Sequence, residues 1–233
     1  MNGPGGDAGV TAAGPAAAGG TVSTGAHDVL MVVDVQADFC PGGALGVEGG
    51  FDVVPVINGL TSKFGRWVYT RDWHPHDHVS FSADPEFRDG SWPPHAVQGT
   101  PGAAWCAGLE MPMNAILISK GDDPALEEYS GFPKQRLDLA EFLRLRKVER
   151  VFIAGLTADY CVKNTALDAC KAGFTVFVVE DAVRGVAPDT TARAYAEMRA
   201  AGVTIIRSEQ IADSGNRPAA AYDEHGHPVH HDD

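Results

Sequence analysis

Six short apolar runs alternate with segments of helical periodicity along most of this chain, and this alternation limits the folds open to it. The apolar runs, which we interpret as buried strands, are Asp28–Val35, Arg66–Thr70, Ala115–Ser119, Arg150–Ala154, Thr175–Val179 and Val203–Arg207. The helical segments are Val53–Lys63, Asp138–Arg146, Val162–Ala172 and Thr190–Ala201. Strands and helices that alternate in this way pair in parallel through right-handed crossovers. The sequence therefore predicts an α/β fold, a three-layer α/β/α domain around a central, mainly parallel six-stranded sheet.

The length of 233 residues, 44% of them hydrophobic, suits one catalytic domain with a tail at each end. Met1–Ala26 has no aromatic residue and predicts a disordered N-terminal tail, because it cannot bury enough surface to offset the entropy of ordering. Asp213–Asp233 is polar, contains four histidines and predicts a flexible C-terminal tail. The predicted domain is thus 27–212. Within it, Arg71–Pro112 shows little periodicity and predicts an ordered loop at the functional site.

The charge balance and the lack of long apolar segments exclude two classes of partner. The formal net charge is −13, and because the two tails carry −1 and −4, the predicted domain keeps −8. Such an acidic domain is not expected to bind nucleic acid. No apolar stretch is long enough to cross a membrane, and the N-terminus lacks the basic and apolar parts of a signal peptide. We expect a cytoplasmic protein without a membrane partner; a homo-oligomeric state stays open.

The four cysteines do not follow the spacing of a disulfide framework. Cys40, Cys106, Cys161 and Cys170 include no CxxC pair, a pattern that fits a reducing cytosol better than a disulfide scaffold. Cys161 and Cys170 lie nine residues apart on one predicted helix, so they face opposite sides of it and cannot bridge each other.

Three polar residues, each at the end of a predicted strand, form a candidate catalytic set. Cys161 lies where the run Val151–Ala154 gives way to a helical pattern, and the positive end of a helix makes a thiol easier to ionise. Asp34 and Lys120 follow two other apolar runs. Taken singly, the Asp could cap a turn and the Lys could be a solvated surface residue. Together they supply a base, an electrostatic stabiliser and a nucleophile at one edge of the sheet.

A second cluster has the composition of a metal site. It covers the run Asp72-Trp73-His74-Pro75-His76-Asp77-His78 and His95 from the segment Trp92-Pro93-Pro94-His95. One carboxylate with several imidazoles suits a divalent ion, zinc first, with iron or manganese as alternatives. His76 is the weak member, because alternation along His74–His78 turns it away from its neighbours. The other interpretation is a group of surface histidines beside prolines.

At these residues the chain resembles the nicotinamidase/pyrazinamidase branch of the isochorismatase-like hydrolases, from about Asp28 to Ala212. The motifs that carry the resemblance are Val33-Asp34-Val35-Gln36-Ala37-Asp38-Phe39-Cys40-Pro41-Gly42-Gly43, Arg71-Asp72-Trp73-His74-Pro75, Trp92-Pro93-Pro94-His95, Ser119-Lys120-Gly121, Tyr129-Ser130-Gly131-Phe132 and Gly155–Val162. One departure is Gly121–Glu128, which is more acidic and slightly longer than in some relatives.

The resemblance implies roles for individual residues. It implies a catalytic triad of Asp34, Lys120 and Cys161, a metal held by Asp72, His74, His78 and His95, and a substrate ring enclosed by Phe39, Trp92 and Tyr129. It also implies a cis peptide bond between Leu156 and Thr157, with the backbone N–H groups of Thr157 and Cys161 as the oxyanion hole.

The activity implied is hydrolysis of nicotinamide to nicotinic acid and ammonia through a cysteine thioester, with pyrazinamide as a further substrate and NAD salvage as the pathway. One alternative is a metal-independent amidase of the same superfamily that acts on an N-carbamoyl compound or a ureide. A vinyl-ether hydrolase of the isochorismatase type fits less well, because it does not use a cysteine at the position of Cys161. From another class, the chain could be a catalytically idle metal-binding or interaction module.

Overall fold

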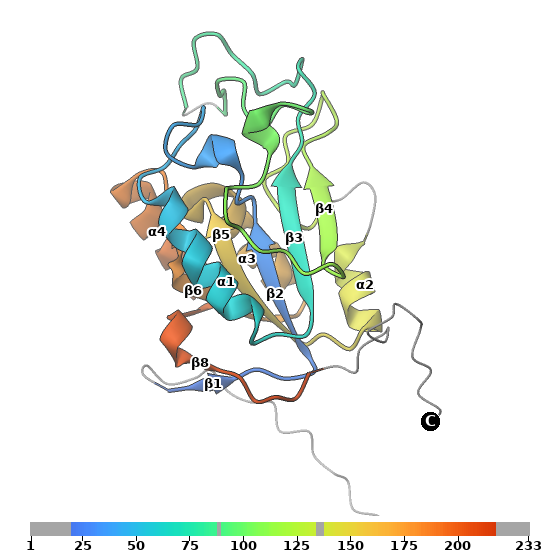
Figure 1. Cartoon of the computed structure of the whole chain (residues 1–233). Helices are drawn as coiled ribbons and strands as arrows, with labels where there is room; N and C mark the ends of the chain where they lie inside the picture. Colours follow the sequence, from blue (N-terminus) through green and yellow to red (C-terminus); the bar gives the residue numbers. More distant parts are fainter. Residues whose placement is uncertain (1–19, 88–89, 134–137, 218–233) are drawn as a thin grey trace, which may run out of the picture.

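The computed structural model describes residues 20–87, 90–133 and 138–217 and contains a six-stranded sheet at its centre (Figure 1). The strands are β2 (Asp28–Val33), β3 (Trp67–Asp72), β4 (Ile116–Lys120), β5 (Arg150–Leu156), β6 (Thr175–Arg184) and β7 (Thr204–Ile206). Their order is β4-β3-β2-β5-β6-β7, and every neighbouring pair is parallel. The predicted fold class is confirmed, and each strand overlaps one of the predicted apolar runs.

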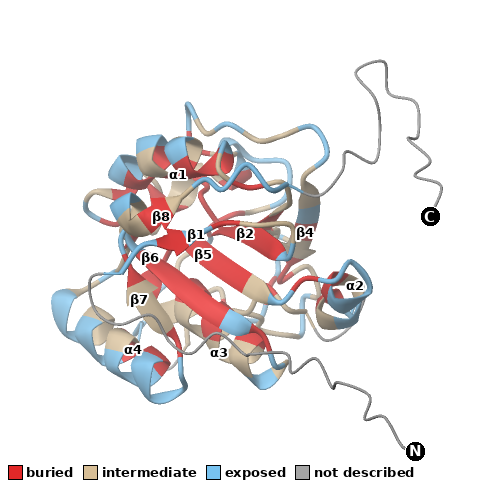
Figure 2. Cartoon of the chain, turned by 90° about the horizontal axis from the view of Figure 1, so that it is seen from below, coloured by how far each residue is buried: buried red, intermediate tan, exposed pale blue. Residues whose placement is uncertain are grey.

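Helices cover both faces of this sheet and complete the three layers. They are α1 (Val53–Thr61), α2 (Leu139–Leu145), α3 (Lys163–Lys171) and α4 (Pro188–Ala200). Helix α1 packs on one face, while α2, α3 and α4 contribute buried side chains to the core on the other. Figure 2 shows the buried residues concentrated on the strands and on the inward sides of the helices. Among the described residues, no helix combines the length and the apolar character needed to cross a membrane.

Strand β2 shows why the apolar runs form the centre of the sheet. All six of its residues are buried, as expected for a parallel strand covered on both faces. Leu30 and Val32 belong to the core beneath α1, whereas Val29, Met31 and Val33 belong to the opposite core. The period of two along a strand therefore divides one continuous apolar run between two layers.

The topology gathers the strand ends that carry the candidate catalytic residues. The chain builds β2, β3 and β4 outward on one side, then returns to place β5 on the other side of β2. Sites in open α/β sheets form at the carboxyl ends of strands beside such a switch point. Asp34 directly follows β2, Lys120 ends β4, and Cys161 comes shortly after β5. The stretch between β3 and β4 holds no sheet strand or α-helix in its described residues, in agreement with the predicted site loop.

The predicted N-terminal tail ends earlier than the sequence indicated, and the boundary at residue 26 is wrong for the described part. Val22–Ser23 forms strand β1, which pairs in parallel with β8 (Ile211–Ala212), and the Val22 side chain is buried. The Thr24 N–H also donates to the Ala212 carbonyl at 2.9 Å. Backbone pairing and one apolar contact outweigh the poor composition of this stretch. Residues 1–19 and 218–233 of the two predicted tails lie outside the described residues.

The structure also corrects the interpretation of the cysteines. Cys40 and Cys106 form a disulfide across 66 residues of sequence, while Cys161 and Cys170 are free thiols. Cysteines this far apart show no pattern in the sequence; they meet because the segment after β2 and the segment near residue 105 lie side by side, as the Gln36–Trp105 bridge shows. The expectation that Cys161 and Cys170 do not bridge is confirmed.

Close approach of β2 and β5 explains one glycine and gives a testable prediction. Gly155 pairs with Val33 at a φ of 120°, and a Cβ on it would lie 2.0 Å from the Val33 carbonyl oxygen. We expect Gly155→Ala to lower the free energy of unfolding by about 2 kcal/mol or more, because backbone atoms must shift to admit the methyl group. Urea denaturation measures this. The matched control is Gly59→Ala on the exposed side of α1, where a Cβ meets nothing within 4 Å. Equal stabilities of the two variants would contradict the prediction.

Candidate active site

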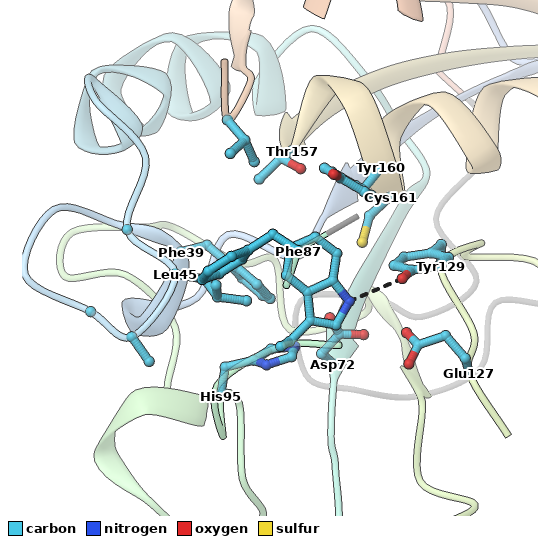
Figure 3. A pocket seen from close by; sticks show the side chains of 15 residues that line it. Phe39, Leu45, Asp72, Phe87, His95, Glu127, Tyr129, Thr157, Tyr160 and Cys161 are labelled. Atoms are coloured by element: carbon cyan, nitrogen blue, oxygen red, sulfur yellow. Dashed lines mark hydrogen bonds between the residues drawn. The ribbon is translucent and has the colours of Figure 1, made fainter. Parts of the chain in front are cut away.

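A cavity of about 310 Å³ opens at the carboxyl edge of the sheet, where the sequence places its candidate residues. Its lining includes Asp72, His95, Cys161 and Thr157, together with a set of apolar and aromatic side chains. In Figure 3, Thr157 and the Cys161 sulfur face the cavity from one side, and His95 and Glu127 from the other. Members of both candidate clusters thus line one cavity.

Lys120 stands at the centre of the predicted triad. Its Nζ lies 2.9 Å from Asp34 Oδ2 and 3.5 Å from Cys161 Sγ, and it also donates to Asp72 Oδ1. Asp34 has a φ of 49°, so its backbone leaves the strand direction at once, and its Oδ1 accepts a 2.6 Å hydrogen bond from Thr70 Oγ1. A carboxylate oxygen of Asp34 and Cys161 Sγ lie within 4.8 Å of each other. The structure therefore brings all three predicted triad residues together.

Burial controls the protonation of these groups. Burial alone would lower the pKa of Lys120, but Asp34 and Asp72 raise it well above its usual value, so the ammonium stays charged. Burial raises the pKa of Cys161 strongly, and Lys120 offsets this only in part while the two carboxylates add to it. Burial thus opposes the ionisation that the helix start was expected to favour, and the pKa of the resting thiol is raised, not lowered. The proton must leave by transfer to a base.

Asp34 is the group placed to receive that proton. Burial raises the pKa of Asp34, although Lys120 and Thr70 act against the rise. By contrast, Lys120 and His74 hold the pKa of Asp72 below its usual value in spite of burial. These two neighbouring carboxylates thus differ in proton affinity. Asp34, with the higher affinity, suits proton transfer, and Asp72, with the lower affinity, suits binding a cation.

The turn after β5 has the backbone geometry that the resemblance implies. The Leu156–Thr157 peptide bond is cis. The Thr157 carbonyl accepts hydrogen bonds from the N–H groups of Tyr160 and Val162 at 3.2 and 3.0 Å, at the start of a π-helical turn over Ala158–Val162. Thr157 and Cys161 both line the cavity. The turn therefore brings Thr157 and Cys161 to the same cavity.

Three members of the predicted metal cluster are grouped at ligand spacing. Suitable atoms of Asp72, His74 and His95 all lie within 4.8 Å of one another, and all three residues are buried. His74 Nδ1 lies 2.8 Å from the Gly121 carbonyl and His95 Nδ1 2.8 Å from the Pro93 carbonyl. Because a carbonyl oxygen only accepts hydrogen bonds, Nδ1 carries the proton in both rings. The Nε2 of each ring then keeps a lone pair that can bind a metal ion. Burial lowers the pKa of His95 to about 4, which keeps the ring in the neutral form that binds metals. The residues fit a divalent cation.

His78 lies beside this group but not in it. Its ring centroid is 4.2 Å from that of His74, yet its Nδ1 contacts Ser80 Oγ at 2.8 Å and its Nε2 contacts the Leu126 carbonyl at 3.0 Å. Both nitrogens are thus engaged by other partners. His76 points away from the cluster, with 89% of its side chain exposed.

Aromatic side chains form the walls of the cavity. The three predicted wall residues, Phe39, Trp92 and Tyr129, all line it, and Trp92 Nε1 donates to the Tyr129 hydroxyl at 3.0 Å. Tyr160 packs edge-to-face on Trp92 with a centroid distance of 5.0 Å. Sequence reasoning did not select Tyr160, although its place next to Cys161 was a usable signal. Phe87, Leu45 and Glu127 were also missed as lining residues.

Gln36 and Asp38, from the motif Val33–Gly43, hydrogen-bond the backbone around the site. The sequence analysis assigned neither residue a role. Gln36 accepts from the Asp72 N–H and donates to the Asp72 carbonyl, both at 2.8 Å. Asp38 accepts from the N–H of Ala96, next to His95, at 2.8 Å and from that of Ala44 at 3.1 Å. These side chains fix the backbone on which the metal cluster and the cavity wall depend.

Comparison with known proteins agrees with the fold and the site. A family profile described as the isochorismatase domain matches residues 28–210. The nicotinamidase of Acinetobacter baylyi is 37% identical over 199 residues, covering 78% of this chain and 93% of that protein. A structure of Pyrococcus horikoshii pyrazinamidase in complex with zinc is 45% identical, with a TM-score of 0.70, covering 78% of this chain and 99% of the other. A structure of an L. infantum protein in complex with nicotinate is 37% identical, with a TM-score of 0.73 and coverages of 82% and 98%. Sequence, fold and the arrangement of the cavity agree, and the chain belongs to the isochorismatase family.

Proposed function

We propose that the protein is a nicotinamidase that hydrolyses nicotinamide to nicotinic acid and ammonia, and that it also accepts pyrazinamide. The observation that carries this is a cavity lined by Cys161, Asp72 and His95. Behind it, Lys120 contacts both Cys161 and Asp34, and His74 is grouped with Asp72 and His95 at ligand spacing. A relative named nicotinamidase and a neighbour solved with nicotinate support the choice of substrate. In this function the protein supplies nicotinic acid for NAD salvage.

The proposed reaction proceeds through a thioester on Cys161. Asp34 takes the thiol proton as Cys161 Sγ forms a bond to the carboxamide carbon, and the N–H groups of Thr157 and Cys161 stabilise the oxyanion. Asp34 then gives the proton to the amide nitrogen, the C–N bond breaks and ammonia leaves. Water adds to the thioester with Asp34 as base, the C–S bond breaks, and the sulfur recovers its proton as the acid departs. Lys120 keeps its positive charge beside Asp34 and Cys161 throughout.

One divalent metal ion is proposed to bind to Asp72, His74 and His95. His78 would become a further ligand when one of its ring nitrogens exchanges its present partner, Ser80 or the Leu126 carbonyl, for the metal. Zinc is the metal we propose first, supported by the donor set and by the zinc complex of a neighbour, with iron and manganese as alternatives. Bound there, the ion would orient the pyridine ring and withdraw electrons from it. Phe39, Trp92 and Tyr129 are proposed to enclose that ring, and they line the same cavity.

Product analysis tests the proposal. Purified, zinc-loaded protein incubated with nicotinamide is expected to release ammonia and nicotinic acid in equal amounts. No release from nicotinamide, but release from an N-carbamoyl compound or a ureide, would instead indicate the metal-independent amidase. If no ammonia is released from any small amide, the result would indicate the remaining alternative, a catalytically idle metal-binding or interaction module.

Two histidine variants test the metal ligands. We expect His95→Ala to lower the zinc content by about tenfold or more at limiting zinc and to raise the KM for nicotinamide, because one of three grouped ligands is lost. His76→Ala is the matched control, since this exposed imidazole contacts none of the cluster. Elemental analysis of both variants gives the result. Loss of zinc from the His76 variant alone would show that the ligand set is wrong.

A further inference from the structure

Glu127 brings an additional carboxylate to the cavity that the reaction above does not use. It belongs to the acidic segment Gly121–Glu128 and lines the cavity together with Asp72, His95 and Cys161. Figure 3 shows its carboxylate directed into the cavity, toward the side where Asp72 lies. The side chain is 27% exposed, yet its Oε2 is inaccessible to solvent and has no hydrogen-bond partner among the described residues.

An oxygen in this position destabilises the protein unless something compensates its charge. A buried acceptor without a hydrogen-bond partner lowers the stability of the folded state, and it does so more strongly when it is charged. His78 is a basic neighbour whose Nδ1 lies 4.0 Å from Glu127 Oε2, and that nitrogen already contacts Ser80 Oγ. The Glu127 carboxyl group has a side-chain hydrogen bond with Ser80, but its Oε2 stays without a hydrogen-bond partner among the described residues.

The charges around the cavity point to the missing compensation. Counted as ionised, Asp34, Asp72 and Glu127 carry three negative charges. Among the described residues, the printed ion pairs of Asp34 and Asp72 bring in one permanent positive charge, that of Lys120. Two negative charges are in excess, which equals the charge that one divalent cation would neutralise. Glu127 itself is not among the residues at ligand spacing, so it would act from outside the ligand set.

We propose that Glu127 is the outer carboxylate of the metal centre, which balances the charge of the divalent cation held by Asp72, His74 and His95 and raises the affinity of the site for it. The inference rests on the metal centre proposed above. It assigns a role to the acidic segment between β4 and Tyr129. One oxygen of Glu127 is buried without a hydrogen-bond partner, and the positive charge of the cation would compensate the charge of this carboxylate. Glu127 acts through the cation and is a positioning residue.

Metal affinity and thermal stability of Glu127→Gln test this role without using activity. The amide keeps the size of the side chain but removes its charge. We expect the zinc affinity, measured by competition with a chromogenic chelator, to fall by about tenfold or more. The metal-free protein is expected to keep its Tm or gain a few degrees, because an unpaired buried charge is gone. Glu127→Asp, which retains the charge, should lose less affinity than Glu127→Gln.

The matched control is Glu209→Gln, which removes one negative charge from a side chain that is 73% exposed on the short helical turn before β8. It should leave both zinc affinity and Tm unchanged. Zinc affinity of Glu127→Gln within about twofold of wild type would overturn the inference, as would a lower metal-free Tm with an unchanged zinc-induced rise. If wild-type protein bound no divalent metal, the proposed metal centre itself would fail, an outcome distinct from failure of the Glu127 role.

Discussion

Cys161→Ala is expected to reduce kcat for nicotinamide hydrolysis on the order of 10⁴-fold or more, because removing a nucleophile leaves only the binding and oxyanion contributions. The fold should persist. Burial holds the thiol in its neutral form, so the substitution removes no charge from the network of Lys120, Asp34 and Asp72. The zinc content should therefore stay at the wild-type value, which separates a chemical defect from a loss of structure.

Ammonia release at saturating nicotinamide, with zinc content and Tm measured on the same samples, gives the result. Cys170→Ala is the matched control: Cys170 is the other free thiol and lies on α3, outside the lining of the cavity. Acid quenching of the wild-type reaction should also trap a nicotinoyl group on the peptide that contains Cys161. Retained turnover in the Cys161 variant would exclude the thioester route.

Lys120→Met is expected to abolish activity and to destabilise the protein by about 3–5 kcal/mol, the usual cost of removing one partner from a buried ion pair. The side chain is fully buried, and the substitution leaves Asp34 and Asp72 facing each other without the ammonium between them. Protonation of one carboxylate would relieve the repulsion. The same event would remove either the base for Cys161 or the anionic ligand of the metal site.

Urea denaturation of metal-free protein measures the stability change, and ammonia release measures the activity. Lys171→Met serves as the control, because that lysine pairs with Asp168 on the surface of α3 with 75% of its side chain exposed. Exposed pairs contribute roughly 0–1 kcal/mol, so this variant should match wild type closely. A Lys120 variant that is stable and active would show that the carboxylates do not need the ammonium.

Much of the fold could be predicted because apolar periodicity reports burial directly. After Asp28, every residue of β2 is apolar from Val29 to Val33, and a strand covered by helices on both sides needs that pattern. The triad was predictable for a related reason: parallel strands point the same way, so residues at their carboxyl ends converge whatever their separation in sequence.

Features built from long-range contacts could not be predicted in this way. The Cys40–Cys106 disulfide joins segments whose proximity depends on the path of the loop between β3 and β4. The pairing of β1 with β8 needs both ends of the domain to meet. The engagement of both His78 nitrogens by Ser80 and Leu126 likewise depends on the fold of two loops.

The sequence by itself determined the three-layer α/β/α class and the residue types of the metal cluster, because both follow from local patterns. It also determined that Asp34, Lys120 and Cys161 lie at strand ends on one edge of the sheet, because parallel strands end on the same side. Only the tertiary structure decided the protonation of Cys161, the grouping of Asp72 with His74 and His95 apart from His78, and the exposure of Glu127 to the same cavity. Desolvation and charge coupling act over a few ångströms through space, and side chains brought that close by loops leave no period in the sequence.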